Sequence, residues 1–159
     1  MGGFSFVFCR SKKIEHILTY IEELASVFPE VTVAKTKKEQ LALERITQGW
    51  IEAITDTGNQ VIDGFIMRDP GGYEDIIDIL HDEKVVPEQD VEGLKQVIRL
   101  RKKLVQEYYN IDYGMLQDVL TTHSKSVEQF PAHVRYYLEN ELGPVSAFLP
   151  NDNKTSEED

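Results

Sequence analysis

Apolar residues recur with the spacing of an α-helix along most of this chain. The first such segment follows Ser11, a residue type that caps helix N-termini, and stops at Phe28-Pro29, where the proline interrupts the pattern. Its apolar positions repeat at i, i+3, i+4 and i+7, as one buried helix face requires: Ile14, Ile17, Leu18, Ile21, Leu24 and Ala25. A short extended link over residues 30–35 is expected to follow.

A long second helix is predicted from Lys37 to Met67. Two glycines inside it, Gly49 and Gly58, are expected to bend it. Its apolar face comprises Leu43, Ile46, Trp50, Ala53, Ile54, Val61, Ile62 and Phe65, and polar side chains such as Glu52 occupy the opposite face.

Proline and glycine then divide the chain into shorter segments. The run of residues 69–72, Asp-Pro-Gly-Gly, predicts a break, and residues 73–82 predict a short helix. Pro87 is expected as the first residue of a fourth helix that ends near Tyr109, because proline suits the first helical turn. Asp112 is the expected N-cap of the last helix.

The last helix presents one apolar face, and Pro131 is expected to kink or split it. The face comprises Leu116, Val119, Leu120, His123, Val127, Phe130 and Val134. The only β-rich pieces, residues 4–8 and 31–33, are short and separated by a helix. The pattern therefore predicts an all-α, up-and-down bundle of four to five helices in a single domain over residues 1–149, followed by a disordered acidic tail at 150–159.

Composition narrows the class of protein. The chain has 159 residues and a formal charge of −11, without an apolar run long enough to cross a membrane. No signal-peptide pattern is present and Cys9 is the single cysteine, so we expect a cytoplasmic protein. The histidines are scattered and no metal-binding or phosphate-loop motif is present, so no metal or cofactor is expected. Packing inside the core is the favoured interpretation of both His123 and Trp50.

One charged residue interrupts an apolar helix face. Arg101 lies near the centre of an arc formed by Leu94, Val97, Ile98, Leu100, Leu104, Val105 and Tyr108. Burying an unpaired charge costs several kcal/mol, so Arg101 must be paired with a carboxylate or exposed to a cleft, a partner chain or an anionic ligand. A structural ion pair is the simplest alternative to a functional role.

Arg101 also belongs to a basic stripe in an acidic protein. Residues 95–103 contain five positive charges and no negative charge: Lys95, Arg99, Arg101, Lys102 and Lys103. The overall charge argues against broad nucleic-acid binding, which depends on phosphate neutralisation, and no DNA partner is expected. The stripe is either a solvated face balanced by surrounding carboxylates or a local anion-binding surface.

The segment Arg101-Lys-Lys-Leu-Val-Gln106-Glu-Tyr108 resembles the HepT-like branch of the HEPN superfamily. Members of that branch carry Arg, four residues, His, one residue and Tyr near the end of the penultimate helix, and are usually encoded beside a minimal nucleotidyltransferase as toxin–antitoxin pairs. Arg101 and Tyr108 match in type and spacing, and the resemblance extends over roughly residues 6–149. Gln106 stands where the family has its histidine.

The resemblance implies a metal-independent RNA endonuclease toxin without a cofactor. In the family, His moves protons between the ribose 2′-hydroxyl and the leaving oxygen while Arg meets the phosphate charge. Arg101, Gln106 and Tyr108 would form this site, and Arg99, Lys102 and Lys103 would contact RNA phosphates. Tyr108 would also accept AMP from the nucleotidyltransferase antitoxin, unless it is simply an interface or core tyrosine.

Gln106 bears on this implied chemistry in two ways. Glutamine has no proton to exchange near pH 7, and general acid–base catalysis typically supplies about 10²–10⁴-fold. On an ideal helix, position 106 also lies about 140° from Arg101, so a shared site needs a distorted helix end or a second protomer. That requirement agrees with the family's habit of dimerising with the motif helices face to face.

Three hypotheses follow from these residues. The first is a homodimeric ribonuclease toxin whose guanidinium at position 101 binds phosphate. The second is a catalytically silent dimeric module that binds a nucleotidyltransferase or RNA without cleaving it. The third is a scaffold whose basic stripe pairs only with its own acidic surface.

Overall fold

Five α-helices account for most of the chain in a computed structural model, which describes residues 2–146. They are α1 (Gly2–Val27), α2 (Lys37–Gly64), α3 (Tyr73–Asp82), α4 (Glu88–Gln106) and α5 (Tyr113–Ser146), and a 3₁₀ turn, η1 (Phe28–Glu30), follows α1. No strand occurs within these residues, so the predicted all-α class with a long second helix is confirmed. The tail predicted at residues 150–159 lies outside the described part of the chain.

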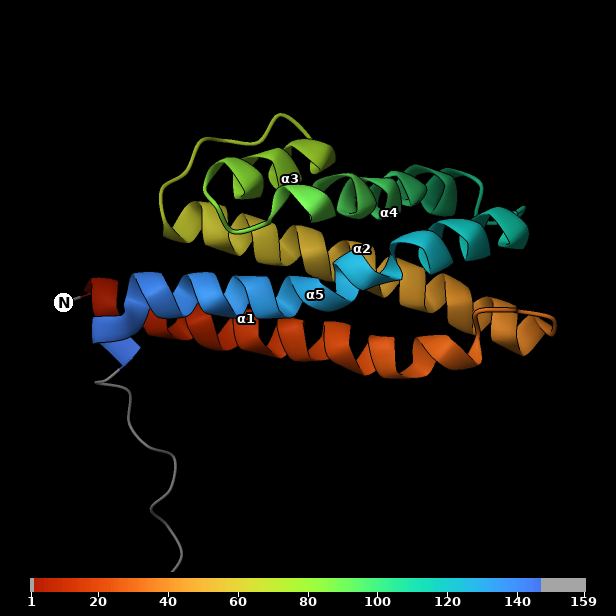
Figure 1. Cartoon of the computed structure of the whole chain (residues 1–159), viewed down its shortest axis with the longest axis horizontal. Helices are drawn as coiled ribbons and strands as arrows, with labels where there is room; N and C mark the ends of the chain where they lie inside the picture. The colour runs from red at the N-terminus through yellow and green to blue at the C-terminus, as the bar shows by residue number, and fades with distance from the viewer. Residues whose placement is uncertain (1, 147–159) are drawn as a thin grey trace, which may run out of the picture.

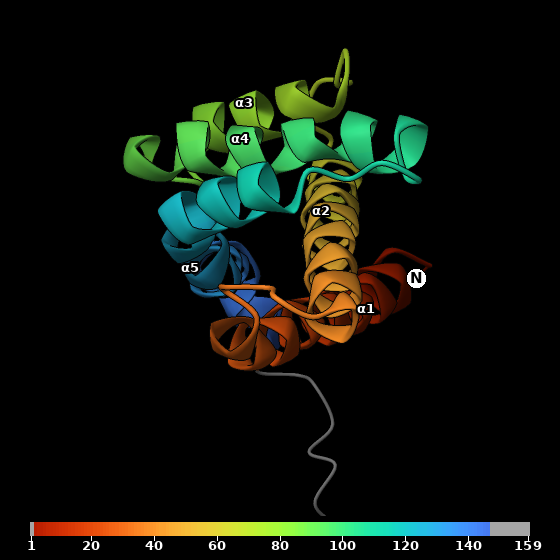
Figure 2. The same cartoon turned by 90° about the vertical axis from the view of Figure 1, so that its right-hand side faces the viewer.

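The helices stack in layers around α2 and α5. Figures 1 and 2 show α3 and α4 side by side in one layer, α1 on the opposite side, and α2 and α5 between them. Contacts between α2 and every other α-helix, and between α5 and both α1 and α4, agree with this arrangement. The layer of α3 and α4 contains the basic stripe predicted from the sequence, so its surroundings decide what that stripe does.

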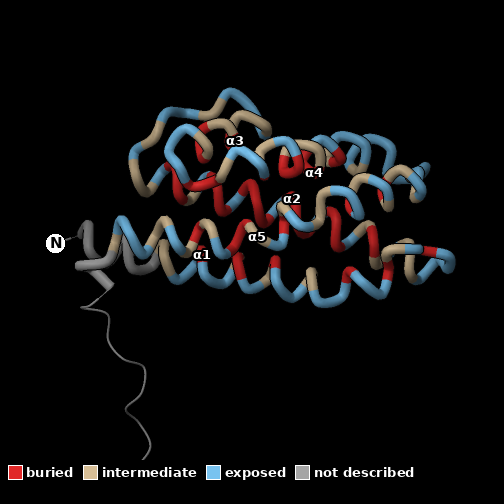
Figure 3. Tube along the Cα trace, viewed as in Figure 1, coloured by how far each residue is buried: buried red, intermediate tan, exposed pale blue. Residues whose placement is uncertain are grey.

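The core follows the predicted apolar faces. Buried residues line the inward side of each helix in Figure 3, whereas exposed residues face outward. Trp50 is fully buried, its ring lies 5.2 Å from that of Phe28, and its Nε1–H donates to the carbonyl of Ile21 at 3.2 Å. The expected core role of Trp50 is therefore confirmed.

The two glycines of α2 mark places where neighbouring helices come close. A Cβ atom added at Gly49 would lie 2.6 Å from Leu24 Cδ1 of α1, and one at Gly58 would lie 2.3 Å from Ile76 Cγ2 of α3. Both distances are shorter than carbon–carbon contact allows. These glycines permit close helix packing, a role that the sequence interpretation of bends did not include.

The N-terminus of α1 corrects one prediction. The helix begins at Gly2, so Ser11 lies inside it and does not cap it. Adding residues to a formed helix costs far less than nucleating one, and the β-rich residues 4–8 have no strand to pair with within the described chain. The helix consequently extends over them.

The end of α2 also differs from the prediction. The helix stops at Gly64 rather than Met67, because Ile66 adopts a left-handed conformation with φ of 53°. The Met67 N–H donates to the carbonyl of Ile62 at 2.9 Å, which closes the helix in a Schellman-type cap.

The bounds of the last two helices contain further differences. Pro87 lies at the N-cap position immediately before α4, and α4 ends at Gln106 rather than near Tyr109. The Asn110 N–H instead donates to Glu107 O in a turn. Helix α5 continues through Pro131 without being split, since buried side chains on both sides of the proline pack it against the core. Asp112 caps α5 as predicted, its Oδ1 accepting from the Met115 N–H at 3.0 Å.

Candidate functional site

Arg101 lies on α4, and its side chain contacts residues of both α2 and α3. Its Cζ atom lies 4.3 Å from the centre of the Tyr73 ring, and its Nε lies 3.6 Å from Glu52 Oε1. The side chain is 34% exposed. The sequence left two alternatives for Arg101, a carboxylate partner or exposure to a cleft or ligand. Both apply, because the guanidinium lies near Glu52 and is still accessible to solvent.

The contact with Glu52 leaves the hydrogen-bonding capacity of Arg101 unused. At 3.6 Å the Nε–Oε1 separation exceeds hydrogen-bond length, and Nε is a buried donor without a partner. Within the described residues, Arg101 donates no hydrogen bond at all, although a guanidinium carries five N–H donors. A half-buried cation with unsatisfied donors is suited to receiving an anionic group.

A hollow of about 430 Å³ adjoins this guanidinium. It lies between the start of α3 and the C-terminal half of α4, and both acidic and basic side chains border it. The lining comprises Gly72, Tyr73, Glu74, Asp75, Ile98, Arg99, Arg101, Lys102, Val105 and Gln106. The structure thus brings Arg99, Arg101, Lys102 and Gln106, four of the residues singled out by sequence, to one surface.

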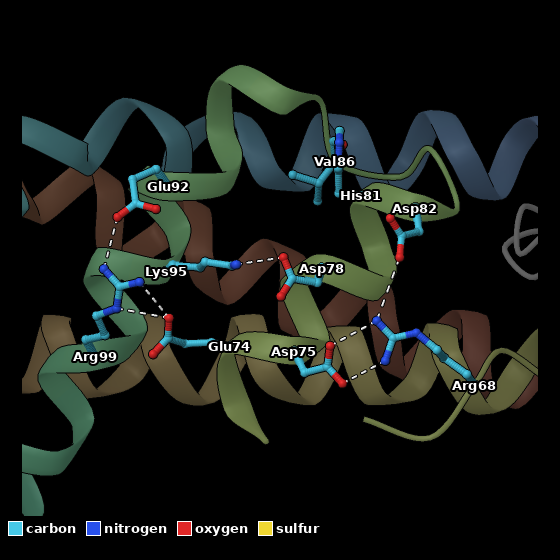
Figure 4. A network of polar contacts seen from close by, with 10 residues as sticks. All are labelled: Arg68, Glu74, Asp75, Asp78, His81, Asp82, Val86, Glu92, Lys95 and Arg99. Atoms are coloured by element: carbon cyan, nitrogen blue, oxygen red, sulfur yellow. Dashed lines mark hydrogen bonds and ion pairs between the residues drawn. The ribbon is translucent and has the colours of Figure 1, made fainter. Parts of the chain in front are cut away.

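The other cations of the predicted phosphate-binding set have different environments. Arg99 is committed to two carboxylates, with Nη2 2.7 Å from Glu74 Oε1 and Nη1 3.0 Å from Glu92 Oε1, as Figure 4 shows. These bonds raise its pKa above the ordinary value, the hydrogen bond to Glu74 contributing most. Lys102 and Lys103 form no ion pair within the described residues. Lys103 lines a different, smaller hollow near the α4–α5 turn.

A clamp in the loop before α3 fixes one wall of the hollow. Arg68 Nη1 and Nη2 donate to the two oxygens of Asp75 at 2.7 and 2.9 Å, and the Gly71 N–H donates to Asp75 Oδ2 at 2.8 Å (Figure 4). The hydrogen bonds from Arg68, and next that from Gly71, lower the pKa of Asp75 to about 2. The loop is thereby tied to the first turn of α3, which carries Tyr73.

Gln106 and Tyr108 lie at and beyond the end of α4. Gln106 is the last helical residue and is exposed. Tyr108 is 72% exposed and lies in the turn after the helix, with its ring 5.4 Å from that of Tyr109 in an edge-to-face contact. The sequence predicted that Tyr108 and Arg101 share a helical face, but they do not, because α4 ends at Gln106. The Tyr108 hydroxyl is open to solvent.

A second polar cluster lies at the opposite end of α4, and sequence reasoning missed it. Asp90 is only 4% exposed, and its carboxylate accepts from Ser126 Oγ at 3.1 Å and lies 3.1 Å from His133 Nε2. The sequence contained a signal of this burial, since Asp90 lies four residues before Leu94 and thus in register with the apolar stripe.

His123 was expected to pack inside the core. It is only half-buried, and within the described chain it lacks the hydrogen bond expected of a core histidine.

Two other kinds of feature are absent from the described residues. No helix within residues 2–146 is long and apolar enough to span a bilayer. No three His, Cys, Asp or Glu side chains come together as a metal site would require in this part of the chain.

Comparison with known proteins decides the family. The sequence profile of the ribonuclease HepT-like family matches residues 14–134, which is most of the chain. This chain belongs to the ribonuclease HepT-like family. It is 49% identical over 141 residues to the Bacillus subtilis (strain 168) protein named "Putative RNase YutE", covering 89% of this chain and 98% of that protein.

Solved structures agree with this membership. The HepT-like chain superposes on the structure of YutE, described as a cytosolic protein of unknown function from Bacillus subtilis, with a TM-score of 0.78 and 47% identity over 87% of this chain and 96% of that chain. It also shares its fold with a tri-AMPylated HEPN toxin of Shewanella oneidensis in complex with an MNT antitoxin. That likeness has a TM-score of 0.59 at 18% identity and covers 82% of this chain and 97% of the toxin.

Proposed function

We propose that this HepT-like protein is a metal-independent ribonuclease toxin whose Arg101 binds an RNA phosphate at the hollow between α3 and α4. The observation that supports the proposal most is that Arg101 lines that hollow and donates no hydrogen bond within the described residues. Phosphate oxygens accept paired hydrogen bonds from a guanidinium, and such charge-assisted bonds are roughly twice as strong as neutral ones.

The roles of the neighbouring residues follow from their positions. Lys102 lines the same hollow and forms no ion pair within the described residues, so it supplies a second positive charge for the RNA backbone. Arg99 lines the hollow too, but a phosphate would have to displace or accommodate its two carboxylate partners. We assign Arg99 a secondary role, and Lys103, on another surface, a peripheral one.

Gln106 sets the expected rate of RNA cleavage. Breaking the phosphodiester through attack of the ribose 2′-oxygen requires transfer of the hydroxyl proton, and an amide side chain cannot take it. The loss of general acid–base catalysis lowers the rate by about 10²–10⁴-fold relative to a histidine at that position. We therefore propose weak cleavage in this protein, with binding by Arg101 retained.

Tyr108 is proposed as the regulatory hydroxyl. Its 72% exposure leaves the phenol accessible to a modifying enzyme, and the structural relative from Shewanella oneidensis is an AMPylated toxin held by an MNT antitoxin. By analogy, a minimal nucleotidyltransferase would bind this chain and transfer AMP to Tyr108. We also propose a homodimer in which two α4 ends face one another, because within one protomer Tyr108 does not line the hollow that Arg101 and Gln106 share.

The test is RNA cleavage and binding in the presence of a chelator. Purified parent protein is expected to bind a single-stranded oligoribonucleotide and cleave it slowly, and Arg101→Ala is expected to lose both properties. Lys125→Ala removes one exposed cation on α5, away from the hollow, and serves as the matched control. Equal binding by the parent and Arg101→Ala would remove Arg101 from the site.

A catalytically silent binding module is the second candidate, favoured by the exposed Gln106 at the histidine position. The variant Gln106→His separates the two candidates. Cleavage that appears in Gln106→His and is absent from the parent supports the silent module, whereas cleavage by the parent that increases in the variant supports the ribonuclease. The same cleavage rate in the parent and in Gln106→His would show that the chemistry does not depend on position 106.

A further inference from the structure

Tyr73 is the aromatic residue against which the proposed phosphate-binding arginine rests. It is the first residue of α3, is 46% exposed, and lines the same hollow as Arg101. Nothing in its sequence context marks it, because it lies 28 positions before Arg101 and follows two glycines. Its relation to Arg101 arises only through the packing of α3 against α4.

The contact between Tyr73 and Arg101 holds a cation without consuming its donors. An aromatic face attracts a guanidinium through the ring quadrupole, and this attraction uses none of the N–H groups. Arg99, two residues away, shows the alternative, since Glu74 and Glu92 occupy its Nε, Nη1 and Nη2 atoms. Arg101 therefore keeps its hydrogen-bonding capacity, whereas Arg99 does not.

The position of Tyr73 is itself fixed. Asp75, two residues further along α3, receives two hydrogen bonds from Arg68 and one from the Gly71 N–H. These bonds join the loop preceding Tyr73 to the turn that follows it. Glu52 lies near Nε of Arg101, so a carboxylate and a ring together restrain the guanidinium.

We propose that Tyr73 is a positioning residue for Arg101, which orients the guanidinium so that its free N–H groups meet an RNA phosphate in the hollow. This role rests on the proposed function of Arg101 as the phosphate ligand. The ring face performs it, and the hydroxyl is not needed, because Tyr73 Oη takes part in no hydrogen bond within the described residues.

The experiment compares Tyr73→Leu, which removes the ring, with Tyr73→Phe, which keeps it. Tyr136→Leu, which removes a 69% exposed tyrosine from α5 at a separate hollow, is the matched control. Two properties are measured in each full-length protein. One is the NMR signal of the Arg101 Nε–H, assigned by its loss in Arg101→Lys, and the other is affinity for a single-stranded oligoribonucleotide.

Ring loss is expected to change both measurements. In Tyr73→Leu the Nε–H signal shifts downfield as the ring current disappears, and RNA affinity falls about two- to fivefold, as an exposed cation–π contact implies. Tyr73→Phe and Tyr136→Leu are expected to retain the parent signal and affinity. Restoration by phenylalanine distinguishes positioning by the ring from a general effect on folding.

Three results would overturn the inference, and they differ from one another. An unmoved Nε–H signal in Tyr73→Leu would show that the ring does not contact the guanidinium in solution. A shifted signal with unchanged RNA affinity, while Arg101→Ala still abolishes binding, would leave the proposed function standing and remove Tyr73 from it. A parent protein that binds no RNA would overturn the proposed function itself, whatever the signal shows.

Discussion

Two charged residues lie on the same stripe of α4, eleven residues apart, and they differ in burial and in hydrogen bonding. Asp90, near the start of the helix, is 4% exposed and bonded to Ser126 and His133 from α5. Arg101, three turns later, has a side chain that is 34% exposed and donates no hydrogen bond within the described residues. A charge whose partners are all supplied by its own fold serves stability, whereas one with unused donors beside a hollow is available to a ligand.

The largest expected effect is on stability, from Asp90→Ala. Removing the carboxylate leaves Ser126 and His133 without their shared acceptor, and we expect the free energy of unfolding to fall by about 2–3 kcal/mol. Urea denaturation measures the change. Arg101→Ala, the matched variant at the other end of the helix, is expected to cost less than about 1 kcal/mol because its ion pair is long and partly exposed. Equal losses in the free energy of unfolding of Asp90→Ala and Arg101→Ala would contradict the difference drawn between the two residues.

The second expected effect tests how closely α4 and α5 pack beside Asp90. A Cβ atom at Gly93 would lie 2.6 Å from Ser126 Oγ and 3.1 Å from Ser126 Cβ. Overpacking costs about 1–3 kcal/mol, and the higher helix propensity of alanine offsets about 1 kcal/mol of it, so Gly93→Ala is expected to destabilise by about 1 kcal/mol.

Gly114→Ala is the control for Gly93→Ala. Gly114 lies in the first turn of α5, and an added Cβ would meet only Asp112 Oδ1 at 3.4 Å. This variant is expected to be stabilised by a few tenths of a kcal/mol up to about 1 kcal/mol, again from helix propensity. Thermal unfolding of both proteins should therefore show shifts of opposite sign. A stabilised Gly93→Ala would mean that the two helices can separate there at no cost.

The sequence predicted the parts of this molecule that depend on local periodicity. Most of the apolar face predicted for each of α1, α2, α4 and α5, the buried Trp50 and the cap at Asp112 follow from spacing and residue type, which act over a few residues. Val105 and Tyr108, at the end of the predicted face of α4, are exposed. Helix ends were less predictable, because the end of α4 at Gln106 depends on whether Tyr108 and Tyr109 find a surface to pack against, and both are exposed.

The environment of the candidate site could not be predicted. Arg101 stood out as a charge on an apolar stripe, but its neighbours Glu52 and Tyr73 come from helices 49 and 28 residues away. No local pattern encodes such pairs. Asp90 lies on the same stripe, but the sequence did not indicate its buried role, since its hydrogen-bond partners Ser126 and His133 are equally remote in sequence.

A smaller effect separates the two lysines that follow Arg101. Lys102 lines the hollow with Arg101, whereas Lys103 lines another one, although the two are adjacent in sequence. Each phosphate contact to single-stranded nucleic acid contributes about 0.7 to the slope of log affinity against log salt concentration. Lys102→Ala is expected to reduce that slope by about 0.7 in oligoribonucleotide binding, and Lys103→Ala to leave it nearly unchanged. Equal reductions of the slope in Lys102→Ala and Lys103→Ala would show that the RNA-binding surface also includes the side of α4 that carries Lys103.

The smallest expected effect concerns acid stability on the Arg101 side of the comparison. The pKa of Asp75 in the folded protein is about 2, below its ordinary value of 3.8, chiefly because Arg68 donates to the carboxylate. Between these values the unfolded chain binds more protons than the folded one, so stability rises with pH. The contribution is complete above about pH 4 and is lost as the pH falls towards 2.

The variant Arg68→Gln should flatten this acid limb. Without the guanidinium the pKa of Asp75 returns towards its ordinary value, and the difference in proton binding between folded and unfolded chains shrinks. Urea midpoints measured from pH 2 to 5 at constant ionic strength should therefore change less steeply in Arg68→Gln than in the parent, whereas Lys125→Gln keeps the parent's slope. An unchanged slope in Arg68→Gln would show that the clamp does not form in solution. Tyr73 would then lack the restraint that holds its ring beneath Arg101. The effects expected of Asp90→Ala and Gly93→Ala on stability would not change.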